Sequence, residues 1–318
     1  MLFDVFNGDA DGLCALHQMR LAHPAQSTLV TGVKRDIRLL AEVRAGAGDE
    51  VTVLDVSLDE NRDDLSRLLA AGARVRYFDH HHAGEIPRHP GLDARIEAAP
   101  DVCTSLLVDR WLNGAQRAWA VVAAFGDNLA RAARSAAAPL ALPEADLEGL
   151  RELGEWINYN SYGDTLQDLH FHPAELYRAM APYADPLEFR RSAPPVEVLA
   201  RGHATDLASA ERHAPLLDGP QGRVVRLPNE AWARRVQGVF ANRLANSAPE
   251  RATALIVDNP DGTLRVSVRA PLARLAGADA LCRPFPGGGG RAAAAGINRL
   301  PPEQLSRFLE AFRTAFET

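Results

Sequence analysis

The sequence predicts an α/β protein in which a parallel sheet forms the first domain and a smaller α/β domain ends the chain. In the first third, apolar runs alternate with segments of helical periodicity, and Leu2–Phe6, Val51–Val56 and Val75–Phe78 are apolar through nearly their whole length. Such strands, separated by helices, are typical of a parallel sheet covered on both faces. A polar cluster follows each of the three runs. Because ligands bind at the carboxyl ends of such strands, we expect these clusters to share one site.

The remaining elements predict two domains and a helical connector. Further strands are predicted at Ser27–Val33, Arg223–Leu227, Ala252–Asp258 and Thr263–Arg269, and helices at Leu13–Ala22, Asn61–Ala71, Glu230–Ser247 and Pro302–Phe316. Helical sequence dominates from Thr104 to about Arg212, and a segment with two prolines and two glycines interrupts it at 213–222. We therefore expect a metal-binding domain at 1–185, a connector at 186–215 and a substrate-binding domain at 216–318.

Composition indicates a globular protein of the cytoplasm. The chain has 318 residues, 47% of them apolar and 24% charged, which is enough for two domains. Its three cysteines are scattered and form no zinc pattern, which suits a reducing compartment. We expect no signal peptide and no membrane span, because the first residues lack a basic region and no uncharged apolar stretch reaches about 18 residues. A net charge of −6 argues against binding to long duplex nucleic acid.

The first polar cluster carries oxygen donors. Asn7, Asp9 and Asp11 alternate along a segment that leaves the first strand, so their side chains are expected on one side, and Gly12 permits a sharp turn into the helix. Carboxylate and amide oxygens are hard donors suited to Mg²⁺ or Mn²⁺. An acidic turn that caps the helix at Leu13 explains this segment alone equally well.

The third cluster is the most informative. Asp79-His80-His81-His82 follows an apolar strand, where three histidines serve little structural purpose and neutral imidazole is a common metal ligand. Asp55, which ends the second run, is by itself as typical of a turn or a helix cap. Taken together, the clusters predict two metal ions. Asp9 and Asn7 would hold one ion, Asp11, His80 and a further carboxylate the other, and Asp55 would bridge them.

These motifs resemble those of the DHH phosphoesterase superfamily, specifically the branch with a C-terminal DHHA1 domain that includes RecJ-like exonucleases and nanoRNases. The segment from Asn7 to Gly12 resembles the first family motif, Asp55 the second and Asp79-His80-His81 the third. The resemblance further implies that Asp127 is the metal ligand of a fourth motif. It also implies that Cys103-Thr104-Ser105 starts a small hydroxyl-rich helix. In this family His80 would bind metal, while His81, adjacent to Asp79, would contact the substrate phosphate and protonate the leaving oxygen.

The C-terminal third carries two further motifs of that branch. Ser267 and Arg269 lie in a segment that resembles the family's Ser-x-Arg strand, and the run from Gly288 to Gly296 resembles its Gly-Gly-Gly-His-x-x-Ala-Ala-Gly signature. Glycines let backbone N–H groups approach an anion, and small alanines permit close packing of the loop and a following helix. The resemblance therefore implies these substrate-binding residues: Ser267, Arg269, Gly288, Gly289, Gly290 and Arg291.

Two positions depart from the family pattern. Asn7 stands where the family usually has His or Asp, which is expected to weaken one metal position. Arg291 stands in place of the substrate-binding His, and arginine binds phosphate in a bidentate manner.

Outside these motifs, Lys34-Arg35 is expected to lie in a solvated loop, with a phosphate contact as the alternative.

The function predicted from these features is hydrolysis of a short single-stranded oligonucleotide or a nucleotide phosphate. Two Mn²⁺ ions would activate a hydroxide, with Mg²⁺ or Co²⁺ as substitutes. An exopolyphosphatase or a cyclic-dinucleotide phosphodiesterase would use the same metals with a different second pocket. A nucleotide sensor without catalysis is the alternative from another class. We expect no membrane partner and a monomer or homodimer.

Overall fold

The computed structural model describes residues 1–317 and divides the chain into two compact units. The first covers Met1–Arg201 and the second begins at Gly202, so the division falls within the long helix α9 (Pro194–Glu211). The predicted connector at 186–215 contains α8 (Pro186–Ser192) and α9. Within the described residues, no helix combines the length and the apolar character needed to cross a membrane.

The first unit is built on a parallel five-stranded sheet with the strand order β2-β1-β3-β4-β5. Its strands are β1 (Leu2–Phe6), β2 (Thr28–Val30), β3 (Glu50–Leu54), β4 (Arg74–Asp79) and β5 (Leu92–Ile96). All the pairings are parallel, as the apolar runs predicted. The strand β5 was missed because its sequence, LDARI, alternates charged with apolar residues and its side chains are only partly buried.

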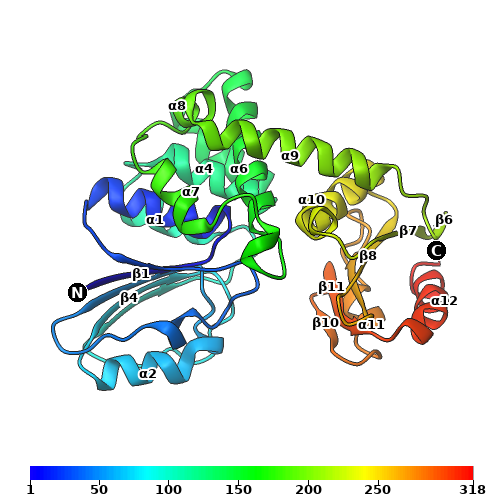
Figure 1. Cartoon of the computed structure of the whole chain (residues 1–318), viewed down its shortest axis with the longest axis horizontal. Helices are drawn as coiled ribbons and strands as arrows, with labels where there is room; N and C mark the ends of the chain where they lie inside the picture. The colour runs from blue at the N-terminus through cyan, green and yellow to red at the C-terminus, as the bar shows by residue number, and fades with distance from the viewer. Residues whose placement is uncertain (318) are drawn as a thin grey trace. The chain divides into compact units, whose positions relative to one another are not determined.

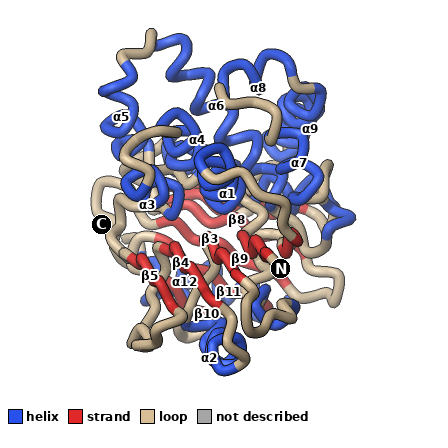
Figure 2. The backbone as a smooth tube through the Cα atoms, turned by 90° about the vertical axis from the view of Figure 1, so that its left-hand side faces the viewer, coloured by secondary structure: helices blue, strands red, loops and turns tan. Residues whose placement is uncertain are grey.

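Helices cover both faces of this sheet (Figure 1; Figure 2). Successive strand residues point to opposite faces, so Phe6 and Phe78 join the core under α1, whereas Val5 and Tyr77 join the core on the side of α2. The helices of this unit are α1 (Ala10–Ala22), α2 (Arg62–Ala70), α3 (Thr104–Trp111), α4 (Arg117–Gly126), α5 (Ala130–Ala137), α6 (Glu144–Ser161), α7 (Pro173–Met180), α8 and the first part of α9. Short 3₁₀ turns lie at Leu39–Glu42, Asp59–Asn61, Ala138–Leu140 and Leu166–Asp168.

The second unit has a mixed six-stranded sheet with the order β10-β11-β9-β8-β7-β6, in which only β7 and β8 are parallel. Its strands are β6 (Leu217–Gly219), β7 (Gly222–Leu227), β8 (Ala252–Asp258), β9 (Leu264–Arg269), β10 (Gly288–Gly290) and β11 (Ala294–Leu300). Helix α10 (Ala231–Ser247) packs on β8 and β9. Helices α11 (Ala278–Cys282) and α12 (Leu305–Ala315) contribute Leu281, Phe308 and Phe312 to the main core of the unit. A 3₁₀ turn, Pro302–Gln304, precedes α12.

The glycine and alanine segment forms a hairpin. Gly288–Gly290 is β10, which pairs antiparallel with β11 through a tight turn closed between Arg291 and Ala294. Helix α11 packs against both strands, and its Ala278 N–H donates to the carbonyl of Ala292 in the turn at 3.0 Å. Small side chains permit this close packing of a helix on the hairpin.

Candidate metal centre

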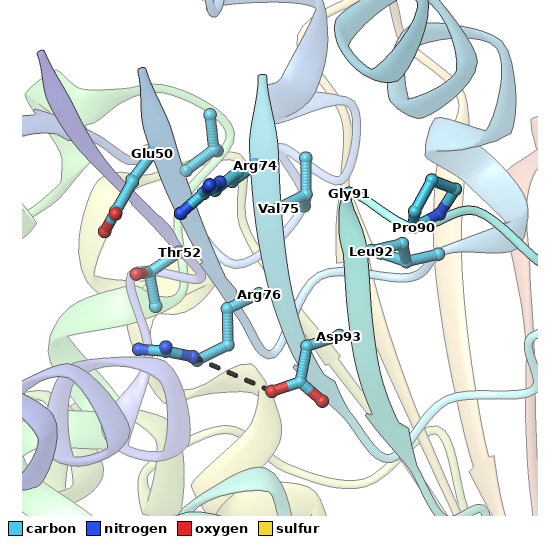
Figure 3. Close-up of a pocket in the computed structure, with 10 residues that line it drawn as sticks. Glu50, Thr52, Arg74, Val75, Arg76, Pro90, Gly91, Leu92 and Asp93 are labelled. Atoms are coloured by element: carbon cyan, nitrogen blue, oxygen red, sulfur yellow. Dashed lines mark ion pairs between the residues drawn. The ribbon is translucent and has the colours of Figure 1, made fainter. Parts of the chain in front are cut away.

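The three polar clusters meet at the carboxyl edge of the parallel sheet. Asn7 follows β1, Asp55 follows β3, and His80 follows Asp79 at the end of β4. These strands are neighbours in the order β1-β3-β4, so their carboxyl ends lie side by side. The opposite edge of the sheet holds a separate pocket at the amino ends of β3 to β5, in which Arg76 lies 3.9 Å from Asp93 (Figure 3).

The first motif enters a helix earlier than the sequence suggested. Asp9 is the N-cap of α1, and its Oδ1 accepts hydrogen bonds from the backbone N–H groups of Asp11 (3.0 Å) and Gly12 (3.1 Å). Asp11 therefore lies in the first helical turn, not in an alternating loop. Gly12 is needed for close packing, since a Cβ at this position would lie 2.2 Å from the carbonyl oxygen of Asn7.

The amino end of α3 fixes the Asp11 carboxylate. The backbone N–H groups of Ser105 and Thr104 donate to Asp11 Oδ1 and Oδ2, each at 2.7 Å. The Ser105 hydroxyl also donates to the Asp11 carbonyl at 2.8 Å. A helix amino terminus stabilises a carboxylate through these free N–H groups and its dipole. The hydroxyl-rich segment after the third motif thus orients a candidate metal ligand.

Asp55 reaches the centre through an uncommon backbone conformation. Its φ is +59°, in the left-handed region that Asp tolerates better than most residues. Its backbone N–H donates to the carbonyl of Phe78 at 3.0 Å, and the Thr104 hydroxyl donates to its Oδ1 at 3.3 Å. This turn directs a buried carboxylate towards His80, whose Nε2 lies 3.4 Å away.

His80 is oriented as a metal-ligating imidazole would be. Its Nδ1 lies 3.0 Å from the carbonyl oxygen of Val102, so the neutral tautomer that donates there leaves a lone pair on Nε2. That Nε2 faces Asp55 and also lies 3.9 Å from Asp127 Oδ2. A backbone carbonyl behind an imidazole is the usual support of a ligand histidine.

Asp79 supports the neighbouring histidine. It is fully buried, and its Oδ1 accepts hydrogen bonds from the His80 backbone N–H (2.8 Å) and from Nδ1 of His81 (2.7 Å). His81 keeps 41% of its side-chain exposure and therefore remains accessible to a ligand. The pair has the arrangement of an oriented acid–base group.

Asp127 arrives from α4, far from the strands in sequence. It is the residue after the last helical turn, where its backbone N–H donates to Ala123, and Asn128 then turns with a φ of +60°. Its carboxylate lies beside His80. Asp127 ends an alanine-rich helix, and nothing in the neighbouring sequence indicates a metal ligand there. Only the family resemblance predicted it.

Lys34 differs from its expected place in a solvated loop. It is not a solvated loop residue: its ammonium pairs with Asp9 Oδ2 and lies 3.6 Å from Asp127 Oδ1. Burial disfavours the charged form of Asp9, but the Lys34 ammonium outweighs it and lowers the pKa of Asp9 to about 2. Asn7, proposed as a metal ligand, donates from its amide to the Lys34 carbonyl at 3.4 Å.

The electrostatics of the centre call for a cation. Burial, reinforced by the charges of Asp9 and Asp11, raises the pKa of Asp55 well above its usual range, and burial raises the pKa of Asp127 to about 6. Burial disfavours protonated His80, but the Asp55 carboxylate reverses this and raises its pKa to about 10. Acids that resist ionisation beside a base that favours protonation indicate an excess of negative charge, which a divalent ion neutralises.

The donor set fits such an ion. In the described residues, two groups of three side chains have ligand atoms within 4.8 Å of one another: Asp11, His80 and Asp127, and Asp55, His80 and His81. Both contain His80, and both combine imidazole with carboxylate, a set suited to Mn²⁺ and other divalent ions.

The predicted substrate residues of the second unit lie on neighbouring strands. Gly296 of β11 is in register with Ser267 of β9 on one side and Gly289 of β10 on the other. Ser267 accepts a hydrogen bond from Gln237 at 2.9 Å, and Arg269 donates to Asn242 at 3.3 Å. The backbone of Gly289 and Gly296, which carries no side chains, therefore lies beside Ser267 and its hydroxyl.

The three glycines of β10 differ in what requires them. A Cβ at Gly288 would lie 2.0 Å from the carbonyl oxygen of Cys282, and Gly290 has a φ of +140°. At Gly289 a Cβ would meet no described atom within 4 Å. Gly288 and Gly290 are therefore needed by the fold, whereas Gly289 leaves open space. Arg291 follows the strand and is exposed.

Comparison with known proteins agrees with this architecture. Residues 221–318 match the DHHA1 domain. Exonuclease RecJ bound to manganese has a TM-score of 0.61 at 19% identity, with 98% of this chain and 89% of RecJ covered. RecJ of Thermus thermophilus in complex with Mn²⁺ has a TM-score of 0.61 at 20% identity. The match covers 98% of this chain but only 51% of that protein, so the chain spans about half the length of that RecJ. The pGpG-specific phosphodiesterase PggH from Vibrio cholerae gives 0.58 at 14% identity, with 99% of both chains covered. No curated protein sequence matches the chain.

The DHHA1 match covers the C-terminal domain, residues 221–318, and the similarity to RecJ and PggH shows that the chain shares their fold. The predicted fold, a parallel α/β domain followed by a smaller DHHA1 domain, is confirmed.

Proposed function

We propose that this protein is a divalent-metal-dependent phosphoesterase that hydrolyses short linear oligonucleotides, with a dinucleotide as the favoured substrate. The observation that carries the proposal is His80, supported by the Val102 carbonyl and facing the carboxylates of buried Asp55 and partly buried Asp127. PggH, which matches over 99% of both chains, is described as specific for pGpG, a linear dinucleotide. The structural match to a small-substrate enzyme over the full length favours a substrate of that size.

The candidate metal ligands are those expected from the sequence: Asn7, Asp9, Asp11, Asp55, His80 and Asp127. We expect Mn²⁺ to serve best, since two similar structures contain it, with Mg²⁺ or Co²⁺ as substitutes. When bound, a divalent ion supplies Lewis-acid activation of water and neutralises charge on the phosphoryl group. The sequence predicted two ions, of which the position beside His80 has the best-supported ligand set.

The chain's own residues perform the remaining steps. Asp79 holds Nδ1 of His81, which is 41% exposed, and we expect Nε2 of His81 to stabilise or protonate the leaving oxygen. The amino end of α3 holds the Asp11 carboxylate in place throughout. In the second unit, we expect Ser267, Arg269 and Arg291 to bind the distal phosphate or base beside Gly288, Gly289 and Gly290. Of these glycines, Gly288 already donates its backbone N–H to the carbonyl of Phe285 at 2.9 Å.

The test is a substrate panel with purified protein and Mn²⁺. We expect pGpG and pApA to be hydrolysed faster than longer oligonucleotides, cyclic dinucleotides, 3′-phosphoadenosine 5′-phosphate or polyphosphate. Preference for polyphosphate or a cyclic dinucleotide would redirect the proposal to that substrate. Binding of nucleotides without hydrolysis of any of them, in the presence of Mn²⁺, would favour a sensor and refute the enzyme.

A further inference from the structure

Lys34 puts a positive charge of the chain itself into the metal centre. It is the only lysine in the sequence, and its ammonium pairs with Asp9 and lies 3.6 Å from Asp127 Oδ1. The ring of Tyr162 lies 5.5 Å from Nζ and adds a cation–π contact. The side chain is only 29% exposed. The ammonium is thus held against two of the carboxylates that are expected to bind metal.

The backbone around Lys34 is fixed from two directions. Its N–H donates to the carbonyl of Ser161 at 3.0 Å, and its carbonyl accepts from the Asn7 side-chain amide at 3.4 Å. The Asn7 side-chain oxygen accepts from the Asp9 backbone N–H at 3.2 Å. The Asn7 amide is therefore oriented through its oxygen within the first motif and holds the Lys34 segment through its nitrogen. This gives Asn7 a role other than ligation, at a position where the resemblance implies a metal ligand.

The ligand geometry leaves Asp9 out of both candidate metal groups, although its carboxylate interacts with that of Asp55. Neither group of close ligand atoms found in the described residues contains Asp9, whereas both contain His80. Asp9 Oδ1 accepts two backbone N–H groups, and Oδ2 accepts the ammonium. A divalent ion on Asp9 Oδ2 would have to displace Lys34 and overcome the attraction of a partly desolvated ion pair.

We propose that the Lys34 ammonium takes the place of a second divalent ion, so that the centre holds one tightly bound ion beside His80. This rests on the proposed function and replaces the two-ion arrangement expected from the sequence. One fixed charge and one exchangeable ion then share the carboxylates, with Asp127 between them: its Oδ1 faces Lys34 and its Oδ2 faces His80. Unlike a metal ion, the ammonium donates hydrogen bonds and does not dissociate.

Counting bound Mn²⁺ tests this proposal independently of activity. Equilibrium dialysis, with bound Mn²⁺ measured by mass spectrometry, is expected to give one tightly bound ion per wild-type chain and two for Lys34→Met, because that variant frees Asp9. Lys34→Arg keeps the positive charge and is expected to retain one ion. Arg35→Met is the matched control: Arg35 pairs with Asp164 at 3.8 Å, and one ion is expected. Two tight ions in the wild-type protein, or one in Lys34→Met, overturn the proposal.

A second measurement needs no variant. Since Lys34 is the only lysine, an amine-selective reagent modifies one side chain, which peptide mass spectrometry separates from the amino terminus. Filling the tight site with Mn²⁺ is expected to leave the labelling rate of Lys34 unchanged or slower, because the ammonium stays on Asp9. Faster labelling on addition of Mn²⁺ shows that the ion displaces Lys34, and this overturns the proposal even if Lys34→Met does not fold.

Failure of this inference is distinguishable from failure of the proposed function. A wild-type protein that hydrolyses pGpG with two tight ions contradicts only the role of Lys34. A protein that binds no Mn²⁺ and hydrolyses no member of the substrate panel contradicts both.

Discussion

The two units of this protein use their sheets in different ways. In the first, a parallel sheet brings buried carboxylates and partly buried histidines to one edge, where helix ends and backbone carbonyls fix them. In the second, a mostly antiparallel sheet presents glycine backbone beside Ser267, with arginines nearby in sequence. Negative charge concentrated by burial, as in the first unit, suits metal binding and catalysis. Glycine backbone without side chains, as in the second unit, suits recognition of an anion.

The substitution with the largest expected effect on activity lies in the first unit, at His80. His80→Ala should lower the rate of hydrolysis by about a thousandfold or more, since several kcal/mol of charge stabilisation are lost with the ion. It should also abolish tight Mn²⁺ binding in equilibrium dialysis. His82→Ala is the matched control, because His82 is exposed and is expected to leave both properties unchanged. Tight binding of Mn²⁺ to His80→Ala would mean that the ion lies elsewhere.

The complementary effect is expected in the second unit, from Arg291. Arg291→Ala should raise KM about tenfold to a hundredfold, the range for losing a hydrogen bond to a charged group, with the number of bound Mn²⁺ ions unchanged. Arg291→His restores the residue usual in the family and should retain much of the affinity. The control is Arg299→Ala, whose side chain is 77% exposed and pairs with Asp261 at 3.6 Å. An unchanged KM for Arg291→Ala would remove this residue from the substrate site.

A smaller effect is expected from pH, and only on the first unit. The pKa of Asp127 is raised to about 6, and its protonated form cannot bind metal. Mn²⁺ affinity should therefore fall as the pH decreases. The Asp127 proton alone should raise Kd about tenfold between pH 7 and pH 5, and the proton on His80, whose pKa is about 10, should steepen the fall further. Isothermal titration calorimetry at several pH values measures this. Asp127→Asn should bind more weakly and give a shallower profile, and an equally steep profile in this variant would assign the Asp127 contribution to another group.

The smallest effects concern the glycines of β10. Gly288→Ala brings a Cβ against the Cys282 carbonyl and should destabilise the protein by about 1–3 kcal/mol, seen as a Tm lower by several degrees. Gly289→Ala meets open space and should change the stability by no more than about 0.5 kcal/mol. If Gly289 lies at the substrate, its variant instead raises KM. Equal losses of stability in the two variants would contradict the division between packing and recognition.

Much of the fold could be predicted from the sequence because the central strands are apolar along most of their length. The strand β5 could not be predicted, since an edge strand with alternating charges resembles a loop. In the metal centre, Asp79 and His80 could be predicted because an acid and three histidines follow an apolar strand. Asp127 ends an alanine-rich helix, and no neighbouring residue distinguishes it from other acids. Lys34 was misread because Asp9 lies 25 positions earlier, and no local pattern reports a pairing over that separation.

The most direct test of the metal centre is anomalous scattering at the manganese edge from a crystal grown with Mn²⁺. We predict a strong peak bounded by His80 Nε2 and the carboxylates of Asp11 and Asp127, with the Lys34 ammonium still on Asp9. Absence of a peak beside His80, in crystals of a protein shown to bind Mn²⁺ in solution, would contradict the proposed metal centre.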